Sequence, residues 1–194
     1  MKRTTGFTII EVMIAVVLMA ILVAMGMPGF KTYLNNTKLR STAQVFLAGV
    51  QKARGEAIQR NANVDFLLTN LDVSGADLAP TPSNAGQNWM IRTSDLATFI
   101  ESKFGAEGSG KAAGEAPPVQ IAGSVAVITF TNLGATTLGA AATFQFTNPD
   151  GGSCVSAGGP MRCLNVVVSP GGQSRLCDPA VSAAATAAGD TRGC

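Results

Sequence analysis

An apolar stretch near the N-terminus constrains this chain more than any other feature. Lys2 and Arg3 precede a run from Phe7 to Met27 in which Glu11 is the only ionisable side chain. As a helix, these roughly 21 residues would cover about 31 Å, and the hydrocarbon core of a bilayer is about 30 Å thick. The run therefore predicts a membrane-spanning helix, and the basic residues before it favour a cytoplasmic N-terminus.

A secretory signal peptide and a plain membrane anchor are the two ordinary alternatives. The apolar core of a signal peptide has about 7–15 residues and ends in a small-residue cleavage site. Here the core is longer, and the candidate small residue, Gly6, lies before it. A plain anchor explains the length but not Glu11. A carboxylate in an apolar span costs about 3 kcal/mol on insertion scales, so such a residue usually has a partner and a function.

Residues 6–11, Gly-Phe-Thr-Ile-Ile-Glu, resemble the leader of type IV pilins, the class III signal peptide. The resemblance implies that a prepilin peptidase cuts between Gly6 and Phe7 and that the new N-terminal Phe7 is methylated. It also implies that Glu11 pairs with the N-terminal amine of a neighbouring subunit in a filament. The alternative role for Glu11 is recognition by the peptidase. The match extends through the span to Pro28.

Composition argues against catalysis. The chain of 194 residues contains no histidine, and histidine is the commonest metal ligand and a common general base. The scattered carboxylates do not suggest a converging acid–base pair. The glycine-rich stretch 105–110 lacks the strand–loop–helix setting and the Lys-Ser/Thr of a phosphate loop. We therefore expect no enzymatic activity, no cofactor and no metal.

Charge is distributed unevenly along the chain. Lys2 and Arg3 account for the whole excess of 14 basic over 12 acidic side chains. Residues 31–60 hold six basic side chains against one acidic, whereas residues 61–194 hold six basic against ten acidic. The body is therefore mildly acidic and shows no large basic patch of the kind that binds a polyanion.

Periodicity predicts that the helix continues beyond the membrane. Gly26, Pro28 and Gly29 mark a weak point, but after them apolar residues recur at three- and four-residue spacing, which places them on one helix face. These residues are Leu39, Ala43, Phe46, Leu47, Val50, Ala53, Ala57 and Ile58. We expect one helix from Phe7 to about Arg60, apolar all round in its first half and amphipathic in its second, with the amphipathic face covering a sheet.

The remainder of the chain reads as a β-rich domain. Alternating or apolar runs bounded by turn residues predict strands at 64–69, 88–92, 119–121, 125–130, 142–147, 164–168 and 173–177. Residues 95–104 read as a short helix or an irregular edge segment, and 105–118 as a flexible loop. Pro170 and Gly171 suit the centre of a type II turn that joins the last two strands into a hairpin.

Three runs resemble the FimT/FimU/GspH family of minor pilins and pseudopilins. Residues 39–43 and 53–61 are similar to that family's LRxxA and ARSEAIKRN runs, with Gly55 and Gln59 in place of the usual serine and lysine. Residues 166–179 resemble its closing hairpin, whereas the middle of the chain matches nothing specific.

This resemblance implies an α+β, type IV pilin-like fold. One long N-terminal helix, transmembrane in one half and amphipathic in the other, would pack on a C-terminal antiparallel β-sheet or sandwich domain. The expected parts are a leader (1–6), a transmembrane half-helix (7–28), an amphipathic half-helix (29–61) and a β-rich globular periplasmic domain (62–194).

The resemblance also implies a minor pilin, a structural or priming subunit of a type IV pilus. The chain would cross the inner membrane once, with its C-terminal domain in the periplasm, and then enter the filament or its tip. Its partners would be the prepilin peptidase and other major and minor pilins. Two alternatives stay open: a minor pseudopilin of a type II secretion system, and a tip-located DNA-binding minor pilin for natural transformation.

The four cysteines predict disulfides. Their number is even, all lie between residues 154 and 194, and the leader directs the domain to an oxidising compartment. Four cysteines allow three connectivities. We favour Cys154–Cys163, which flank a Gly-Gly-Pro turn, and Cys177–Cys194, which would tie down an Ala-rich tail.

The DNA-binding alternative depends on the closing hairpin. DNA-binding members of the family resemble one another in a GRxR run there, and the matching residues 172–175 are Gly, Gln, Ser and Arg. Arg175 is therefore present, while Gln173 replaces the first arginine. On a strand these two side chains would share a face, and Arg162 or Arg192 would help if the disulfides bring them close. Alternatively, Arg175 is a solvated surface arginine. We expect weak, sequence-independent DNA binding at most.

Overall fold

The computed structural model describes residues 7–71, 73–105 and 117–194. The leader, with Gly6, and most of the expected loop 105–118 lie outside the described residues. The elements in chain order are α1 (Ile9–Arg60), β1 (Val64–Thr69), β2 (Asn88–Thr93), β3 (Phe99–Lys103), β4 (Gln120–Gly123), β5 (Val127–Phe130), β6 (Ala142–Thr147), the 3₁₀ turns η1 (Pro149–Gly151) and η2 (Val155–Ala157), β7 (Leu164–Val168), β8 (Ser174–Cys177) and α2 (Ala183–Ala187).

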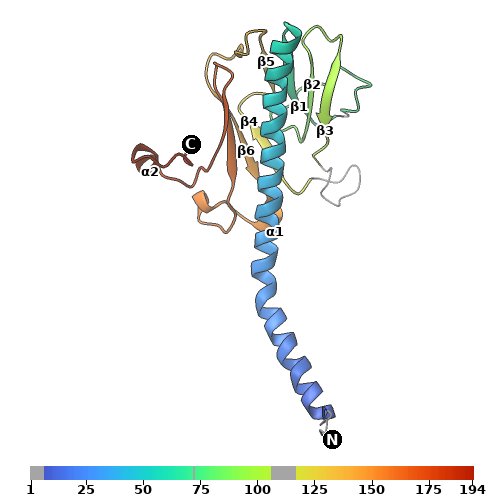
Figure 1. Ribbon diagram of the computed structural model, residues 1–194, viewed down its shortest axis with the longest axis vertical. Helices are drawn as coiled ribbons and strands as arrows, with labels where there is room; N and C mark the ends of the chain where they lie inside the picture. The colour runs from blue at the N-terminus through green and yellow to red at the C-terminus, as the bar shows by residue number, and fades with distance from the viewer. Residues whose placement is uncertain (1–6, 72, 106–116) are drawn as a thin grey trace, which may run out of the picture.

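Helix α1 is the longest element of the fold, and the sheets pack along its second half (Figure 1). It runs unbroken past Gly26 and Gly29 for 52 residues. At its start the Thr8 hydroxyl accepts a hydrogen bond of 3.3 Å from the main-chain N–H of Glu11, which caps the first turn. At its end Asn61 adopts a left-handed conformation with φ 49°, a geometry that asparagine tolerates better than most residues. Figure 1 shows the first half of α1 projecting away from the strands, with the strands gathered along the second half.

The strands form two antiparallel sheets of four. One has the order β3-β2-β1-β5, and the other has the order β4-β6-β7-β8. β1 pairs with β2 over its whole length, from Val64 opposite Thr93 to Thr69 opposite Asn88. The closing hairpin pairs β7 with β8. The long helix packed on antiparallel sheets is the α+β architecture that the sequence predicts.

The buried face of α1 joins the two sheets through one aromatic cluster. The Phe46 ring lies 4.9 Å from that of Phe66 on β1, and 5.0 and 5.2 Å from those of Phe144 and Phe146 on β6. Its helix neighbours at three- and four-residue spacing are fully buried as well: Leu39, Ala43, Val50, Ala53 and Ala57. The expectation that Ile58 shares this face is wrong, because its side chain is 52% exposed.

Trp89 on β2 fixes how closely α1 approaches the first sheet. Its ring stacks on Phe66 with centroids 5.3 Å apart. A Cβ atom on Gly49 of α1 would lie 2.8 Å from Trp89 Cη2, closer than carbon atoms approach without displacement. The absence of a side chain at Gly49 therefore lets the helix lie against the indole.

The outer face of the first sheet is covered, contrary to the half-buried strand that alternation in β1 predicts. All six residues of β1 are buried, and Leu67 and Met90 pack with Val73 from the loop after β1. Asp65 Oδ1 on this face accepts hydrogen bonds from Ser94 Oγ and Thr129 Oγ1, at 2.7 and 2.8 Å. The buried guanidinium of Arg92 lies 3.6 Å from Asp65 Oδ2. A buried carboxylate of this kind is stable only because these groups compensate its lost hydration.

Two further local expectations need correction. Residues 99–103 are an edge strand, β3, rather than a helix or an irregular segment. The expected type II turn is wrong, because the residue with positive φ is Gly172 and not Gly171. Gly172 N–H bonds to Ser169 O across the turn, and Ser169 N–H bonds to Gln173 O, the pattern of a type I turn followed by a left-handed glycine.

Candidate assembly surface and closing hairpin

The first half of α1 presents an apolar surface that the rest of the chain does not cover. Every side chain from Ile9 to Met27 is exposed. Within the described residues, α1 is the one helix long and apolar enough, by length and composition, to cross a membrane. Exposed apolar surface of this extent marks contact with a membrane or with other proteins.

Glu11 lies in the first turn of α1, beside the expected cleavage point. Its main-chain N–H is capped by Thr8, and a carboxylate in this turn is favoured by the helix macrodipole. The Glu11 side chain is exposed, and no described residue forms an ion pair with it. Phe7, at 84% exposure, is equally uncovered. The geometry places both groups on a free surface, available to a partner outside the chain.

Both disulfides join cysteines that are neighbours in sequence. Cys154–Cys163 has a Cα–Cα separation of 5.4 Å, and Cys177–Cys194 one of 5.1 Å. This is the nearest-neighbour connectivity that the sequence favours. The second disulfide ties the tail, with its short helix α2, to the end of β8.

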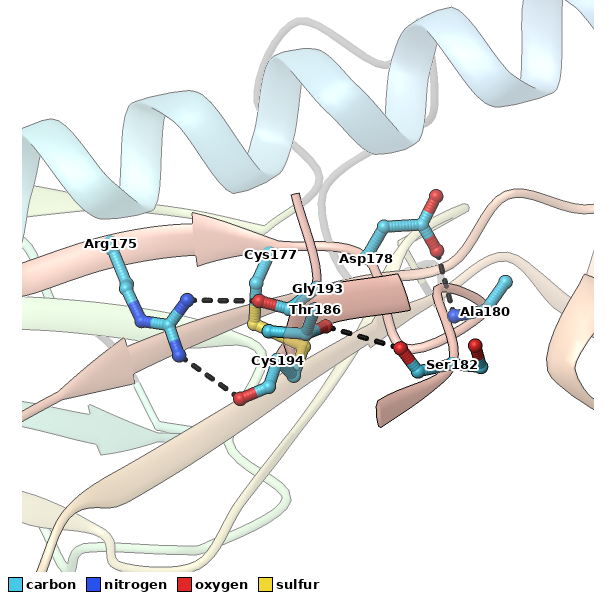
Figure 2. Close-up of a disulfide and its surroundings, with 8 residues drawn as sticks. All are labelled: Arg175, Cys177, Asp178, Ala180, Ser182, Thr186, Gly193 and Cys194. Atoms are coloured by element: carbon cyan, nitrogen blue, oxygen red, sulfur yellow. Dashed lines mark hydrogen bonds between the residues drawn. A yellow bond between two sulfur atoms is a disulfide. The ribbon is translucent and has the colours of Figure 1, made fainter. Parts of the chain in front are cut away.

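Arg175 holds the same tail through hydrogen bonds. Its Nη1 donates to the main-chain oxygen of Gly193 at 2.9 Å, and its Nη2 to that of Cys194 at 3.0 Å. Figure 2 shows both bonds beside the Cys177–Cys194 disulfide. Arg175 is exposed, but it is not the freely solvated arginine considered from the sequence, because its guanidinium binds the tail. A phosphate at this position would share or displace these two bonds.

The other three residues considered for DNA binding do not gather around Arg175. Gln173 is exposed and lies in the turn before β8, where its main-chain N–H bonds to Ser169 Oγ at 3.2 Å. Arg162 and Arg192 instead line a cavity together with Arg40 of α1. Sequence reasoning did not single out Arg40, although the excess of basic residues over 31–60 is the signal that contains it.

Arg192 is fixed by a neighbouring carboxylate. Its Nε and Nη2 donate to Asp190 Oδ1 and Oδ2 at 3.0 and 2.7 Å. These hydrogen bonds lower the pKa of Asp190 from 3.8 to about 2 and raise the pKa of Arg192. The pair is therefore ionised at any physiological pH.

Metal binding finds no support in the described part of the chain. No group of three or more Cys, Asp or Glu side chains there could hold a metal ion. The polar cluster at Asp65 and Arg92 lies within the first sheet, where Asp65 accepts hydrogen bonds from Ser94 and Thr129, so it is a structural element of the sheet.

Comparison with known families gives two matches. The model of the prokaryotic N-terminal methylation motif matches residues 1–27. The model described as type II transport protein GspH matches residues 42–172. No curated protein sequence matches the chain.

Solved structures of two proteins are similar to this chain. The type IV minor pilin FimU of Pseudomonas aeruginosa is 17% identical in each of two crystal forms. The matches cover 71% and 74% of this chain and 90% and 91% of FimU, with TM-scores of 0.47 and 0.49. The minor pseudopilin EpsH of the Vibrio cholerae type 2 secretion system is 13% identical, over 74% of this chain and 99% of EpsH, with a TM-score of 0.47.

The two family models match different parts of the chain. The methylation motif covers the exposed first half of α1, and the second model begins at residue 42 within the amphipathic half and extends over the sheets as far as the turn of the closing hairpin. Since the second match spans well over half of the residues, the chain belongs to the GspH family of type II transport proteins, a family of structural pilin and pseudopilin subunits.

Proposed function

We propose that this chain is a minor pilin, a structural or priming subunit of a type IV pilus. The observation that carries the proposal is the apolar, uncovered first half of α1, which lies within the residues that the methylation-motif model matches. Such a helix suits two environments in succession, first the inner membrane and then the helical core of a filament. The β-rich domain would lie in the periplasm before assembly.

Processing and assembly would act on the first turn of α1. We infer that the prepilin peptidase cuts between Gly6 and Phe7 and that Phe7 is then methylated. The amine of Phe7 in one subunit would pair with Glu11 of its neighbour, because an unpaired carboxylate in an apolar environment is costly. The exposure of both groups agrees with this role.

Two substitutions test the proposal in cells. Gly6→Val is expected to leave an uncut precursor in the inner membrane. Glu11→Ala is expected to be processed and inserted normally but to be missing from purified filaments. Glu56→Ala is the matched control, because Glu56 is a second glutamate of α1 that only pairs with Arg60, at 2.7 Å. Filaments that contain Glu11→Ala at the wild-type level would contradict the proposal.

A secretion role is the second candidate, and the match to the type II transport protein GspH favours it. A minor pseudopilin would use the same processing and the same helix. Deletion of the gene separates the two: loss of surface pili with normal export supports the pilus, and accumulation of exported proteins in the periplasm supports secretion.

DNA binding stays a separate proposal that rests on Arg175 and Gln173. The hydrogen bonds of Arg175 to the tail and the glutamine at position 173 both weaken it. We expect low affinity without sequence preference, measurable by mobility shift at two salt concentrations.

A further inference from the structure

A cavity of about 370 Å³ lies between α1 and the end of the closing hairpin. Tyr33 and Arg40 of α1 form one wall, and Leu176 of β8 lies opposite. Arg162, before β7, and Arg192, in the tail, lie on its border. A cavity of this size holds one or two side chains of a partner and is small for a whole folded element.

The walls of the cavity are held in place by the chain itself. Asn36 Oδ1 of α1 accepts a hydrogen bond of 2.8 Å from the main-chain N–H of Arg162, which joins the segment before β7 to the helix. On the far side, the Cys177–Cys194 disulfide and the two hydrogen bonds of Arg175 fix the tail that carries Arg192. The site is therefore built from three segments far apart in sequence, and each is anchored.

The charge of the cavity is unbalanced. Three guanidinium groups line it against one carboxylate, that of Asp178. Arg192 is neutralised by Asp190, and Asp178 accepts a hydrogen bond from the main-chain N–H of Ala180. Within the described residues, the guanidinium groups of Arg40 and Arg162 have no ion-pair or hydrogen-bond partner. Two unpaired cations at one small cavity favour an anionic group from outside the chain.

The surface of α1 on the N-terminal side of the cavity indicates where this anionic group comes from. Phe30, Tyr33 and Leu34 are 62%, 67% and 41% exposed, so the uncovered apolar surface of α1 continues to the rim. Arg40 follows Met27 by about 13 residues, or roughly 20 Å of helix. The headgroup layer on one side of a bilayer is only about 5–8 Å thick, so lipid headgroups do not reach Arg40. A protein that packs along the first half of α1 and continues along the helix does reach Arg40.

We propose that this cavity binds a carboxylate side chain of a neighbouring pilin-type subunit, with Arg40 and Arg162 as its ion-pair partners. The inference rests on the proposed function, because it takes the occupant from the filament. It adds a second polar contact to the one at Glu11, in the periplasmic part of α1 rather than in its first turn. The uncovered apolar surface of α1 would supply the area of contact. The two arginines would select a partner that carries Asp or Glu at the matching position along the helix axis.

A photo-reactive amino acid at Thr37, which lines the cavity, tests the contact in the full-length chain expressed in its own cells. The same amino acid at Val45, an exposed position on a different face of α1 from Arg40 and outside the cavity lining, is the control. The expected adduct at Thr37 joins a peptide of another pilin-type subunit that contains Asp or Glu, with little at Val45. A lipid adduct, a peptide without an acidic residue, or no adduct in assembled material would overturn the inference.

Charge reversal then tests the ion pair. Arg40→Glu is expected to lower the yield of the Thr37 adduct by about tenfold, because it places two carboxylates together. Lys38→Glu makes the same change of charge at an exposed helix position outside the cavity and should leave the yield unchanged. Replacing the partner's carboxylate by lysine should restore the adduct of Arg40→Glu.

An equal yield in Arg40→Glu and Lys38→Glu would overturn the inference while leaving the proposed function intact. Absence of the unsubstituted chain from both membrane and filament fractions would instead overturn the proposed function, and the inference with it. Trp89 fluorescence, from an indole that is 4% exposed in the core, verifies that each variant is folded.

Discussion

The residues of α1 from Ile9 to Met27 and those from Leu39 to Ala57 belong to one unbroken helix, but their apolar side chains have different neighbours. In the second segment one face is fully buried against two sheets. In the first, apolar residues occur on every face and all are exposed. The second segment therefore stabilises the fold of this chain, whereas the first can be buried only by a membrane or by other subunits. Substitutions in the two halves should separate folding from assembly.

The largest expected effect on folding is at the centre of the buried face. Phe46→Ala removes the ring that contacts both sheets and should lower the free energy of unfolding by about 3–5 kcal/mol. Leu18→Ala in the exposed half should change it by less than about 0.5 kcal/mol. Urea unfolding of the chain in detergent micelles, followed by Trp89 fluorescence, measures both. Equal losses would mean that the first half of α1 also stabilises the folded domain.

The second effect concerns the C-terminal tail, which the Cys177–Cys194 disulfide attaches to the end of β8. Replacing Cys177 and Cys194 by serine should lower the free energy of unfolding by about 3 kcal/mol, the chain-entropy estimate for a loop of this length. The double variant should still insert into the membrane, because the exposed half of α1 does not touch the tail. Urea unfolding and membrane fractionation test the two statements. An unfolding midpoint equal to that of the wild type would show that the tail is held by other contacts.

The third effect is smaller and tests whether DNA binding belongs to the folded half alone. A fragment from Lys31 onward should bind DNA as weakly as the full chain, Arg175→Gln should abolish the binding, and Gln173→Arg should strengthen it with a steeper salt dependence. A mobility-shift titration at two salt concentrations measures this. Tight binding that Arg175→Gln does not affect would place the site elsewhere.

The smallest effect is at Asp190, whose pKa Arg192 lowers to about 2. Because the pKa of the folded state lies below 3.8, the pair contributes stability that is complete above about pH 3.8 and is lost as the pH falls towards about 2. An NMR titration should show Asp190 protonating near pH 2, and closer to pH 3.8 in Arg192→Gln. Titration of the wild-type residue near pH 3.8 would contradict the hydrogen bonds to Arg192.

The helix and most strands could be predicted because they leave periodic signals. The spacing of Leu39, Ala43 and Phe46 defines the buried face, but Ile58 extends the same spacing into the exposed end of the helix. Periodicity reports neighbours along the helix, and it does not report where the sheet below it ends. The covered outer face of β1 was missed for a related reason, since the loop whose Val73 packs on Leu67 and Met90 has no regular pattern.

The site was predictable only where it lies in one continuous run. Residues 6–11 form a motif that can be read directly, and the even cysteine count with short spacings suggests the pairing. The contacts of Arg175 are to main-chain oxygens, which any residue supplies, so no pattern of side chains in the sequence predicts them. Arg40 and Arg162 are far apart in sequence, and only the packing of the hairpin on α1 brings them to one cavity.

The mass of the N-terminal peptide of the mature protein tests the central claim most directly, because it reports whether the exposed half of α1 is processed for assembly. We predict a peptide that begins at Phe7 and carries one methyl group on its amine, together with loss of this peptide in Gly6→Val. A mature chain that begins at Met1 would reduce the first half of α1 to a plain anchor. A chain that begins near residue 28 would make it a cleaved signal peptide, and either result would contradict the account.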